Sequence, residues 1–186
     1  MKSKKIELIN RTEWRSKSGK LHRLDGPAIE WSNGSTEWYS NGRKHRVGGP
    51  AIKLSDGHKE WWFKGELHRL DGPAIIEFDG TKEWYKNGKL YRDDGPTIER
   101  STGTKEWRFH GGLHRLDGPA VEWCNGTKEW WVSGKKHRVD GPAIEYHSGF
   151  EEWYYNGNHF QSKESWFKAL AKEDQMIYLF NMECSK

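Results

Sequence analysis

The sequence predicts a mainly β protein, in which six 23-residue repeats form an elongated, twisted antiparallel β-meander with a C-terminal α-helical cap. Three features carry this prediction. A Gly-Pro pair, a second glycine and a Glu-Trp pair all recur at the same interval along the chain. The prolines of the Gly-Pro pairs are Pro27, Pro50, Pro73, Pro96, Pro119 and Pro142. Each repeat combines β-favouring residues with turn residues, so neighbouring repeats are expected to pair side by side.

The composition fits a stack of repeats better than one large globular core. Hydrophobic residues make up only 33% of the chain, but 12 tryptophans supply large side chains at regular positions. Two distant cysteines and the lack of a long apolar run predict neither a disulfide scaffold nor a membrane span. We therefore expect a cytoplasmic protein, in the cytoplasm of the host cell if the protein is viral. The net charge of +4 permits an anionic partner without requiring one.

Residues 1–18 are predicted to form an N-terminal capping strand segment. A basic start precedes an apolar stretch, residues 6–9, which is either a first strand or part of a frayed terminus. Thr12, Glu13 and Trp14 resemble the Glu-Trp strand of the repeats, but one extra residue precedes the next turn glycine. A bulge or an irregular capping strand explains this extra residue.

Residues 19–161 are predicted to form the repeat array, with Asn-Gly, Asp-Gly and Ser-Gly pairs at the hairpin turns. If each pair is a two-residue turn, Ile29 faces Trp38, and Trp38 faces His45. The other face of the sheet then carries Glu30, Glu37 and Arg46 as an ionic ladder, in which the arginine offsets repulsion between the glutamates. The Asp-Gly-Pro segment ends each pairing, because proline has no amide hydrogen to donate.

Residues 162–186 depart from the repeat and are predicted to be helical. Ser162 is a suitable N-cap for a first helix that ends near Lys172. A second helix is expected over residues 173–183, with one side buried against the end of the sheet. The residues expected on that buried side are Met176, Ile177, Leu179 and Phe180.

The chemistry-bearing residues recur with the repeat, which favours a structural role. The His-Arg dipeptide occurs five times and the facing glutamates several times, whereas an enzyme does not need several equivalent catalytic sites. The sequence contains no phosphate-binding glycine loop, no zinc-spaced Cys/His cluster and no nucleophile elbow. We therefore predict that the protein is not an enzyme, with no catalytic residue, no metal site and no cofactor.

Departures from the repeat cluster in the middle of the chain, where a ligand site is one interpretation. Tyr91 stands where other repeats have histidine, and Arg108 where they have an aromatic residue. Exposed aromatic rings interleaved with arginines can stack on bases or sugars, but cross-strand packing is the favoured explanation of these rings. Ordinary sequence drift in a tolerant repeat is the alternative. The candidate ligand-binding residues are Tyr85, Arg92, Arg108, His110 and Arg115.

The repeat resembles a known family. Asn41, Gly42 and His45, with Lys89 and the hairpin glycines, are similar to MORN-type repeats, especially the divergent variants of bacterial, phage and giant-virus proteins. The resemblance covers residues from about 11 to 161. This chain departs from it at Arg46 and the Asp-Gly-Pro segment, where an ordinary repeat has glycines. The resemblance implies an elongated, twisted sheet of hairpins that serves as an interaction surface without catalytic residues.

Two functions follow as hypotheses. The first is a non-enzymatic binding module for a protein partner or for self-association. The alternative is capture of a nucleotide or nucleic acid by arginine and aromatic side chains, as in a phage or viral protein that sequesters a host signalling nucleotide. Carbohydrate binding is a third hypothesis, supported only by the abundance of tryptophan and tyrosine.

Overall fold

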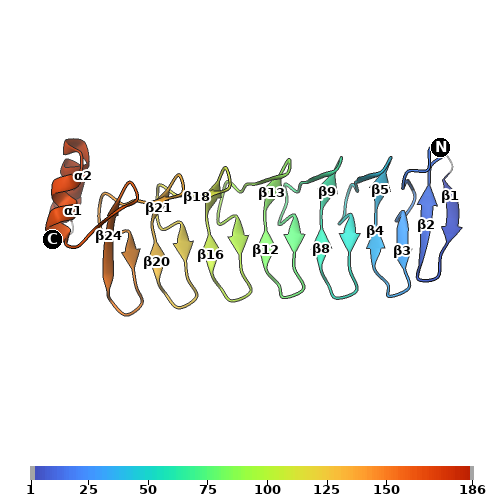
Figure 1. Ribbon diagram of the computed structural model, residues 1–186, viewed down its shortest axis with the longest axis horizontal. Helices are drawn as coiled ribbons and strands as arrows, with labels where there is room; N and C mark the ends of the chain where they lie inside the picture. Colours follow the sequence, from blue (N-terminus) through green and yellow to red (C-terminus); the bar gives the residue numbers. More distant parts are fainter. Residues whose placement is uncertain (1–2, 185–186) are drawn as a thin grey trace. The chain divides into compact units, whose positions relative to one another are not determined.

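The computed structural model of the protein describes residues 3–184 and is mainly β, with two helices near its C-terminal end (Figure 1). It divides into two compact units, Met1–Ser101 and Thr102–Lys186. Within each unit, antiparallel strands follow one another in chain order as a meander. The predicted β class, meander and C-terminal helices are thus confirmed. The first two residues of the predicted N-terminal cap and the last two of the predicted helical cap lie outside the described residues.

Two kinds of short strand alternate in every repeat. The main strands form the sheet of each unit, whereas the ribbon strands pair only in twos, at one end of the main strands (Figure 1). In the first unit the main strands are β1 (Lys4–Glu7), β2 (Arg11–Arg15), β3 (Ile29–Trp31), β4 (Thr36–Glu37), β7 (Ile52–Lys53), β8 (Lys59–Glu60), β11 (Ile75–Ile76), β12 (Lys82–Glu83) and β15 (Ile98–Glu99). Its ribbons are β5 (Tyr39–Ser40) with β6 (Arg43–Lys44), β9 (Trp62–Phe63) with β10 (Glu66–Leu67), and β13 (Tyr85–Lys86) with β14 (Lys89–Leu90).

The second unit repeats this arrangement and ends in the helices. Its main strands are β16 (Lys105–Glu106), β19 (Val121–Glu122), β20 (Lys128–Glu129), β23 (Ile144–Glu145), β24 (Glu151–Tyr155) and β25 (Asn158–Phe160). Its ribbons are β17 (Arg108–Phe109) with β18 (Gly112–Leu113), and β21 (Trp131–Val132) with β22 (Lys135–Lys136). The helices are α1 (Lys163–Ala169) and α2 (Lys172–Cys184).

The turns of the ribbons are the predicted two-residue turns. Asn41 and Gly42 both have positive φ, at 51° and 81°, as a type I′ turn requires. Tyr39 therefore faces Lys44, and the amide of His45 donates to the carbonyl of Trp38 at 3.1 Å. The predicted pairing of Trp38 with His45 is confirmed.

The turns that join the main strands are longer, and here the predicted register is wrong. Beyond β3, the amide of Trp31 still donates to the carbonyl of Ser35 at 2.9 Å, so the loop contains three residues, 32–34, of which only Gly34 has positive φ. A type I turn followed by a left-handed glycine is the usual geometry of such a loop. Ile29 consequently faces Glu37 and not Trp38, while Glu30 faces Thr36.

This one-residue difference removes the predicted ionic ladder. Glu37 lies between Ile29 and Ile52 on one face of the first unit's sheet. Arg46 does not face Glu37, because it follows the ribbon and turns back over Trp38. The error in loop length thus removes the contact between Glu30 and Glu37, whereas the contact between Glu37 and Arg46 is lost because the chain leaves the ribbon at Arg46.

Hydrogen bonds between side chains and turn amides connect consecutive repeats. At the ribbons, the amide of Lys64 donates to Nδ1 of His45 at 3.1 Å. At the opposite turns, the amide of Ser55 donates to Oγ of Ser35 at 2.9 Å. Histidine and Ser/Thr recur at these positions because they accept a hydrogen bond from the next repeat. The same histidine contact is made by His22, His68, His114 and His137.

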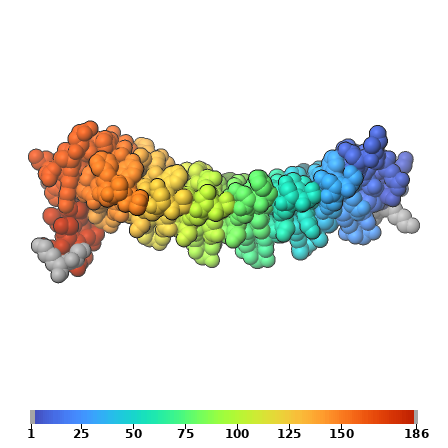
Figure 2. Space-filling view, turned by 90° about the horizontal axis from the view of Figure 1, so that it is seen from below, coloured from blue at the N-terminus to red at the C-terminus, as the bar shows by residue number. Residues whose placement is uncertain are grey.

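The two ends of the repeat array are closed differently. β1 pairs with β2, and β2 pairs with β3, so the N-terminal segment extends the sheet of the first unit. At the C-terminal end, Ser162 caps α1 by accepting from the amide of Ser165, as predicted. α1 lies beside β24 and β25, and the helices project on one side of these strands (Figure 2).

The buried side of α2 differs from the prediction. Tyr178 is buried, whereas Met176, Ile177, Leu179 and Phe180 are exposed. Tyr178 packs with Trp166 and Leu170 of the first helical segment, and this small core occupies only the 174/175/178 side of α2. Met176, Ile177, Leu179 and Phe180 therefore take no part in this core.

Candidate functional site

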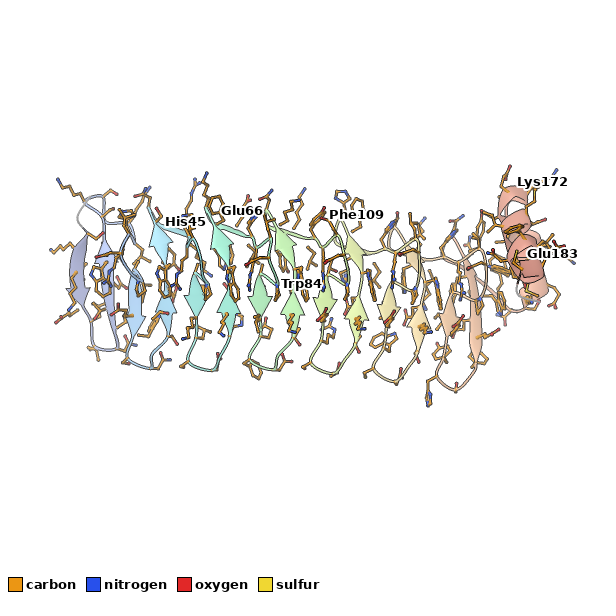
Figure 3. All side chains as sticks on the ribbon, turned by 180° about the vertical axis from the view of Figure 1, so that it is seen from behind. His45, Glu66, Trp84, Phe109, Lys172 and Glu183 are labelled. Carbon is orange, nitrogen blue, oxygen red and sulfur yellow. The ribbon has the colours of Figure 1, made fainter. Side chains whose placement is uncertain are left out.

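Six arginines, spaced 23 residues apart, each lie over the ring of a Glu-Trp tryptophan in a cation–π contact. Trp84 lies among the main strands of the first unit, below the ribbon end at which His45 and Glu66 lie (Figure 3). The distances from guanidinium carbon to ring centre are 4.0 Å for Arg23 and Trp14, 3.8 Å for Arg46 and Trp38, 4.1 Å for Arg69 and Trp61, 4.0 Å for Arg92 and Trp84, 4.1 Å for Arg115 and Trp107, and 3.8 Å for Arg138 and Trp130.

The Gly-Pro pair provides the other side of this arginine site. A Cβ added to Gly26 would lie 2.7 Å from the guanidinium carbon of Arg23, too close for any other residue without moving the arginine off its tryptophan. The guanidinium also donates to the carbonyl of Pro27 at 3.2 Å. Glycine and proline therefore recur because the arginine is held between the tryptophan ring and this backbone.

Five of the six arginines also pair with an aspartate two residues later, and Arg46 is the exception. Arg69, for example, donates to Asp71 at 2.9 Å. Gly48 occupies the aspartate position after Arg46, and Lys53 occupies the position at which Glu30 pairs with Arg23. Among the described residues, Arg46 forms no ion pair.

The glutamate of each Glu-Trp pair is held as a hydrogen-bonded carboxylate. Glu152 accepts from the hydroxyl groups of Tyr146 and Tyr154, at 2.8 and 2.9 Å. Burial opposes the charge of Glu152, but these hydrogen bonds outweigh it and lower its pKa. Burial and the bond to Glu152 raise the pKa of Tyr154 to about 12. The charge of this glutamate thus fixes neighbouring side chains in place.

Two of the ligand-binding residues predicted from the sequence, Tyr85 and Arg92, lie in the first unit. The hydroxyl group of Tyr85 donates to Glu83 at 2.9 Å, as the matching tyrosine does in other repeats. Arg92 lies over Trp84 and pairs with Asp94 and Glu99. Both side chains already have partners within the repeat.

The other three, Arg108, His110 and Arg115, lie in the second unit. Arg108 donates to Glu106 at 2.8 Å, which is the contact that tyrosine or tryptophan makes in other repeats. The ring of His110, at a ribbon turn, packs on Phe109 with 4.1 Å between ring centres. Arg115 lies over Trp107 and pairs with an aspartate. Binding of a ligand by these residues stays a prediction, and their geometry accounts for each of them structurally.

Grooves separate the Arg-Leu-Asp-Gly loops of consecutive repeats. We call them loop grooves and name each by its two arginines. The groove between Arg23 and Arg46 has a volume of about 610 Å³, and that between Arg46 and Arg69 about 510 Å³. The groove between Arg69 and Arg92 measures about 580 Å³. Tryptophans held under an arginine line these grooves: Trp38, Trp61 and Trp84.

Exposed apolar side chains stand between the loop grooves of the first unit. Leu24, Val47 and Leu70 occupy the same position in three consecutive repeats and are 75%, 78% and 76% exposed. We call these three residues the apolar ridge. In the following repeat the position is Asp93, which accepts a hydrogen bond from Tyr91. The apolar ridge is therefore a row of exposed apolar side chains repeated beside the grooves of the first unit.

The equivalent groove of the second unit, between Arg115 and Arg138, is lined partly by the chain's own helix. Ile177 and Asn181 of α2 line this groove, which has a volume of about 560 Å³. Val139, at the ridge position, is half-buried here, unlike the residues of the apolar ridge. The second unit therefore shows an apolar helix residue beside a loop groove.

A second candidate site lies at the ribbon end of the first unit. Lys20, Arg43 and Lys64 line a pocket of about 420 Å³ together with His45. None of the three cations forms an ion pair with a residue that the structure describes. The stems of two of them lie over turn glycines, Lys20 over Gly42 and Arg43 over Gly65 of the next repeat.

No protein-family model matches the chain, and no curated protein shows a significant sequence match to it. Within residues 3–184, no cluster of three or more His, Cys, Asp or Glu side chains is arranged to hold a metal ion. The same residues include no helix with both the length and the apolar character needed to cross a bilayer.

His58 is a titratable side chain between two carboxylates, an arrangement that the repeat pattern did not predict. Its two ring nitrogens contact carboxylates, with Nδ1 2.8 Å from Glu77 and Nε2 3.0 Å from Glu60. Burial opposes the charge of the ring, but the two carboxylates outweigh it and raise its pKa. Other repeats have serine, threonine or phenylalanine at this position, so the departure is visible in the sequence, but its partners are not.

We expect this site to make stability depend on pH above about 6.5, the ordinary histidine pKa. Because the pKa is raised in the folded state, the stabilisation is complete below that pH and is lost as pH rises through the folded-state value. Hydrogen bonds to charged groups contribute about 1.5–3 kcal/mol. Urea unfolding of the wild type and of His58→Gln should therefore differ more at pH 6 than at pH 9. An equal difference at both pH values would contradict a charged His58.

The sequence also contained signals for Arg46 and for the cationic pocket. Gly48 and Lys53 replace the acidic partners of Arg46, but the assumed pairing with Glu37 concealed the loss. Lys20 and Arg43 follow turn glycines at the repeat interval, and Lys64 replaces the asparagine of the turn. Their proximity depends on the stacking of one ribbon on the next.

Proposed function

We propose that the protein is a non-enzymatic binding module that holds a protein partner, or another copy of itself, on its loop grooves. The observation that carries this proposal is the apolar ridge, Leu24, Val47 and Leu70, repeated beside grooves that arginine-stacked tryptophans line. In monomeric proteins, exposed apolar residues arranged in a regular row favour an interaction surface. The resemblance to MORN-type repeats supports the same function.

The arginine–tryptophan stacks favour this function physically. Each guanidinium is held by the tryptophan ring, by the proline carbonyl and, in five repeats, by an aspartate. A surface whose side chains are already ordered loses little conformational entropy on binding. The grooves are therefore suited to a partner that inserts apolar side chains between the loops.

Site-specific photocrosslinking tests the proposal. A photoreactive residue replaces Leu70 on the ridge or, as the control, Phe78, which is 73% exposed in a turn between main strands. In extracts of the cells that naturally make the protein, we expect protein adducts from position 70 and not from position 78. Val47→Asp should reduce the adducts about tenfold or more, as loss of a central apolar contact does. Equal labelling from both positions, or none from position 70, would contradict the proposal.

A phosphate-bearing ligand at Lys20, Arg43 and Lys64 is a second candidate function. Three cations that form no ion pair with the described residues lie in one pocket and favour an anion, and stacking on nearby rings would suit a nucleotide. We expect salt-sensitive binding of ATP or of a short oligonucleotide, weakened about tenfold by Arg43→Ala. Lys89→Ala is the matched control, since Lys89 also follows a turn glycine but does not line the pocket. Calorimetry at low salt that detects no binding of either ligand would exclude this function.

A further inference from the structure

Arg46 is the one arginine of its series without an acidic partner among the described residues. It lies over Trp38 and donates to the carbonyl of Pro50 at 3.0 Å. It lines both the Arg23/Arg46 and the Arg46/Arg69 loop grooves, beside Val47 of the apolar ridge. A guanidinium held in this way is suited to a carboxylate, which it binds with charge-assisted hydrogen bonds. The grooves beside Arg46 therefore favour a partner that combines an apolar side chain with an acidic one.

The outward side of α2 offers that combination. Met176 and Phe180 are 71% and 65% exposed, and Glu183 is exposed one turn further on. Residues at positions i, i+4 and i+7 share one face of a helix, so these three side chains form one stripe. Glu183 lies on α2 in Figure 3 and forms no ion pair with a described residue. The inward side of the same helix is anchored by Tyr178.

The chain itself shows that this helix is compatible with a loop groove. Ile177, which adjoins the outward stripe, lines the Arg115/Arg138 groove of the second unit. The groove of the second unit has nearly the same volume as those beside Arg46, about 560 Å³ against about 610 and 510 Å³. The walls also correspond, since arginine, an apolar ridge residue and tryptophan recur at the same positions.

We propose that the occupant of the grooves beside Arg46 is α2 of a second copy of the chain, with Phe180 inserted between Val47 and Leu70 and Glu183 paired with Arg46. This inference rests on the proposed function and specifies its partner. The two surfaces are different patches of the same chain, so the contact is heterologous. Complementary charge at Arg46 and Glu183 sets its direction, while the apolar stripe and ridge supply the buried area.

Sedimentation velocity of the full chain over a concentration series tests this inference. Reducing conditions exclude disulfide-linked species, because Cys184 is exposed next to Glu183. We expect the wild type to associate reversibly, and Phe180→Ser or Arg46→Gln to weaken association about tenfold or more. Arg92→Gln is the matched control, because it removes the same kind of tryptophan stack without lining the grooves beside Arg46 or the groove beside α2. It should associate like the wild type.

A charge exchange makes the test specific. Arg46→Glu alone and Glu183→Arg alone should each fail to associate, whereas an equimolar mixture of the two should regain association. A wild type that stays monomeric, or association that survives Phe180→Ser and Glu183→Arg, would overturn the inference. If the wild type is monomeric but position 70 still crosslinks to another protein, the proposed function stands and only the second copy is wrong. If neither occurs, both fail.

Discussion

Replacing Trp166 with alanine is expected to release the helical cap from the second unit. The indole of Trp166 is completely buried. The centre of its ring lies 4.7 Å from that of Trp153 and 5.3 Å from that of Tyr178. Truncating a buried aromatic residue to alanine costs about 3–5 kcal/mol. In a repeat protein each element is stabilised mainly by its neighbours, so the loss should fall first on α1 and α2. Thermal melts followed by circular dichroism should show helical signal lost before the β signal.

Two control variants define the contribution of the indole. Leu179→Ala alters an exposed side chain of α2 and should leave the melt nearly unchanged. Trp166→Phe should cost less than Trp166→Ala, since Nε1 of Trp166 has no hydrogen-bond partner among the described residues. If helix and sheet still melt together in Trp166→Ala, at the wild-type temperature, the cap does not depend on this ring.

Replacing Ile52 with alanine is expected to destabilise the first unit by about 2–5 kcal/mol. Ile52 is 5% exposed and lies in the sheet between Glu37 and Glu60. Its removal leaves a cavity beside two carboxylates whose hydrogen-bond partners include Tyr39 and Trp62. Urea unfolding followed by tryptophan fluorescence measures the loss directly.

A graded series distinguishes packing from other effects at this position. Ile52→Val removes a single methylene group and should cost about 0.5–1.5 kcal/mol. Ile9→Ala is the control, because Ile9 is 107% exposed relative to its reference and should change stability little. Equal effects of Ile52→Ala and Ile9→Ala would show that the isoleucine face of the sheet is not a core.

Local sequence signals predicted the elements that depend on a few adjacent residues. The type I′ turn at Asn41 and Gly42 follows from the positive φ that these residues accept, and Ser162 caps α1 by a contact three residues away. The register predicted around Gly34 was wrong by one residue, because the loop has three residues and not two. An Asn-Gly pair suits both a two-residue turn and the end of a three-residue turn, so the pair alone does not determine which residues face each other.

The candidate site was less accessible to sequence reasoning than the fold. Arg108 departs from the repeat and was therefore a natural candidate for ligand binding, yet it takes over the contact of an aromatic residue with the adjacent glutamate. Arg46 follows the consensus and was assigned to a ladder, yet it is the arginine left without an acidic partner among the described residues. Whether a residue that departs from the repeat is free to bind a ligand depends on the partners that the folded chain places beside it.

By itself, the sequence determined that the protein is a β-repeat with a helical end, because the 23-residue period combines β-favouring residues with hairpin turn pairs and stops before residue 162. The tertiary structure decided which residues share a face, since the register depends on loop geometry. It also decided that arginines lie over tryptophans and that the outer side of α2 is exposed. Arg46 and Trp38 are only eight residues apart, but they meet because the ribbon turns the chain back on itself, and the exposure of α2 depends on how the helix packs.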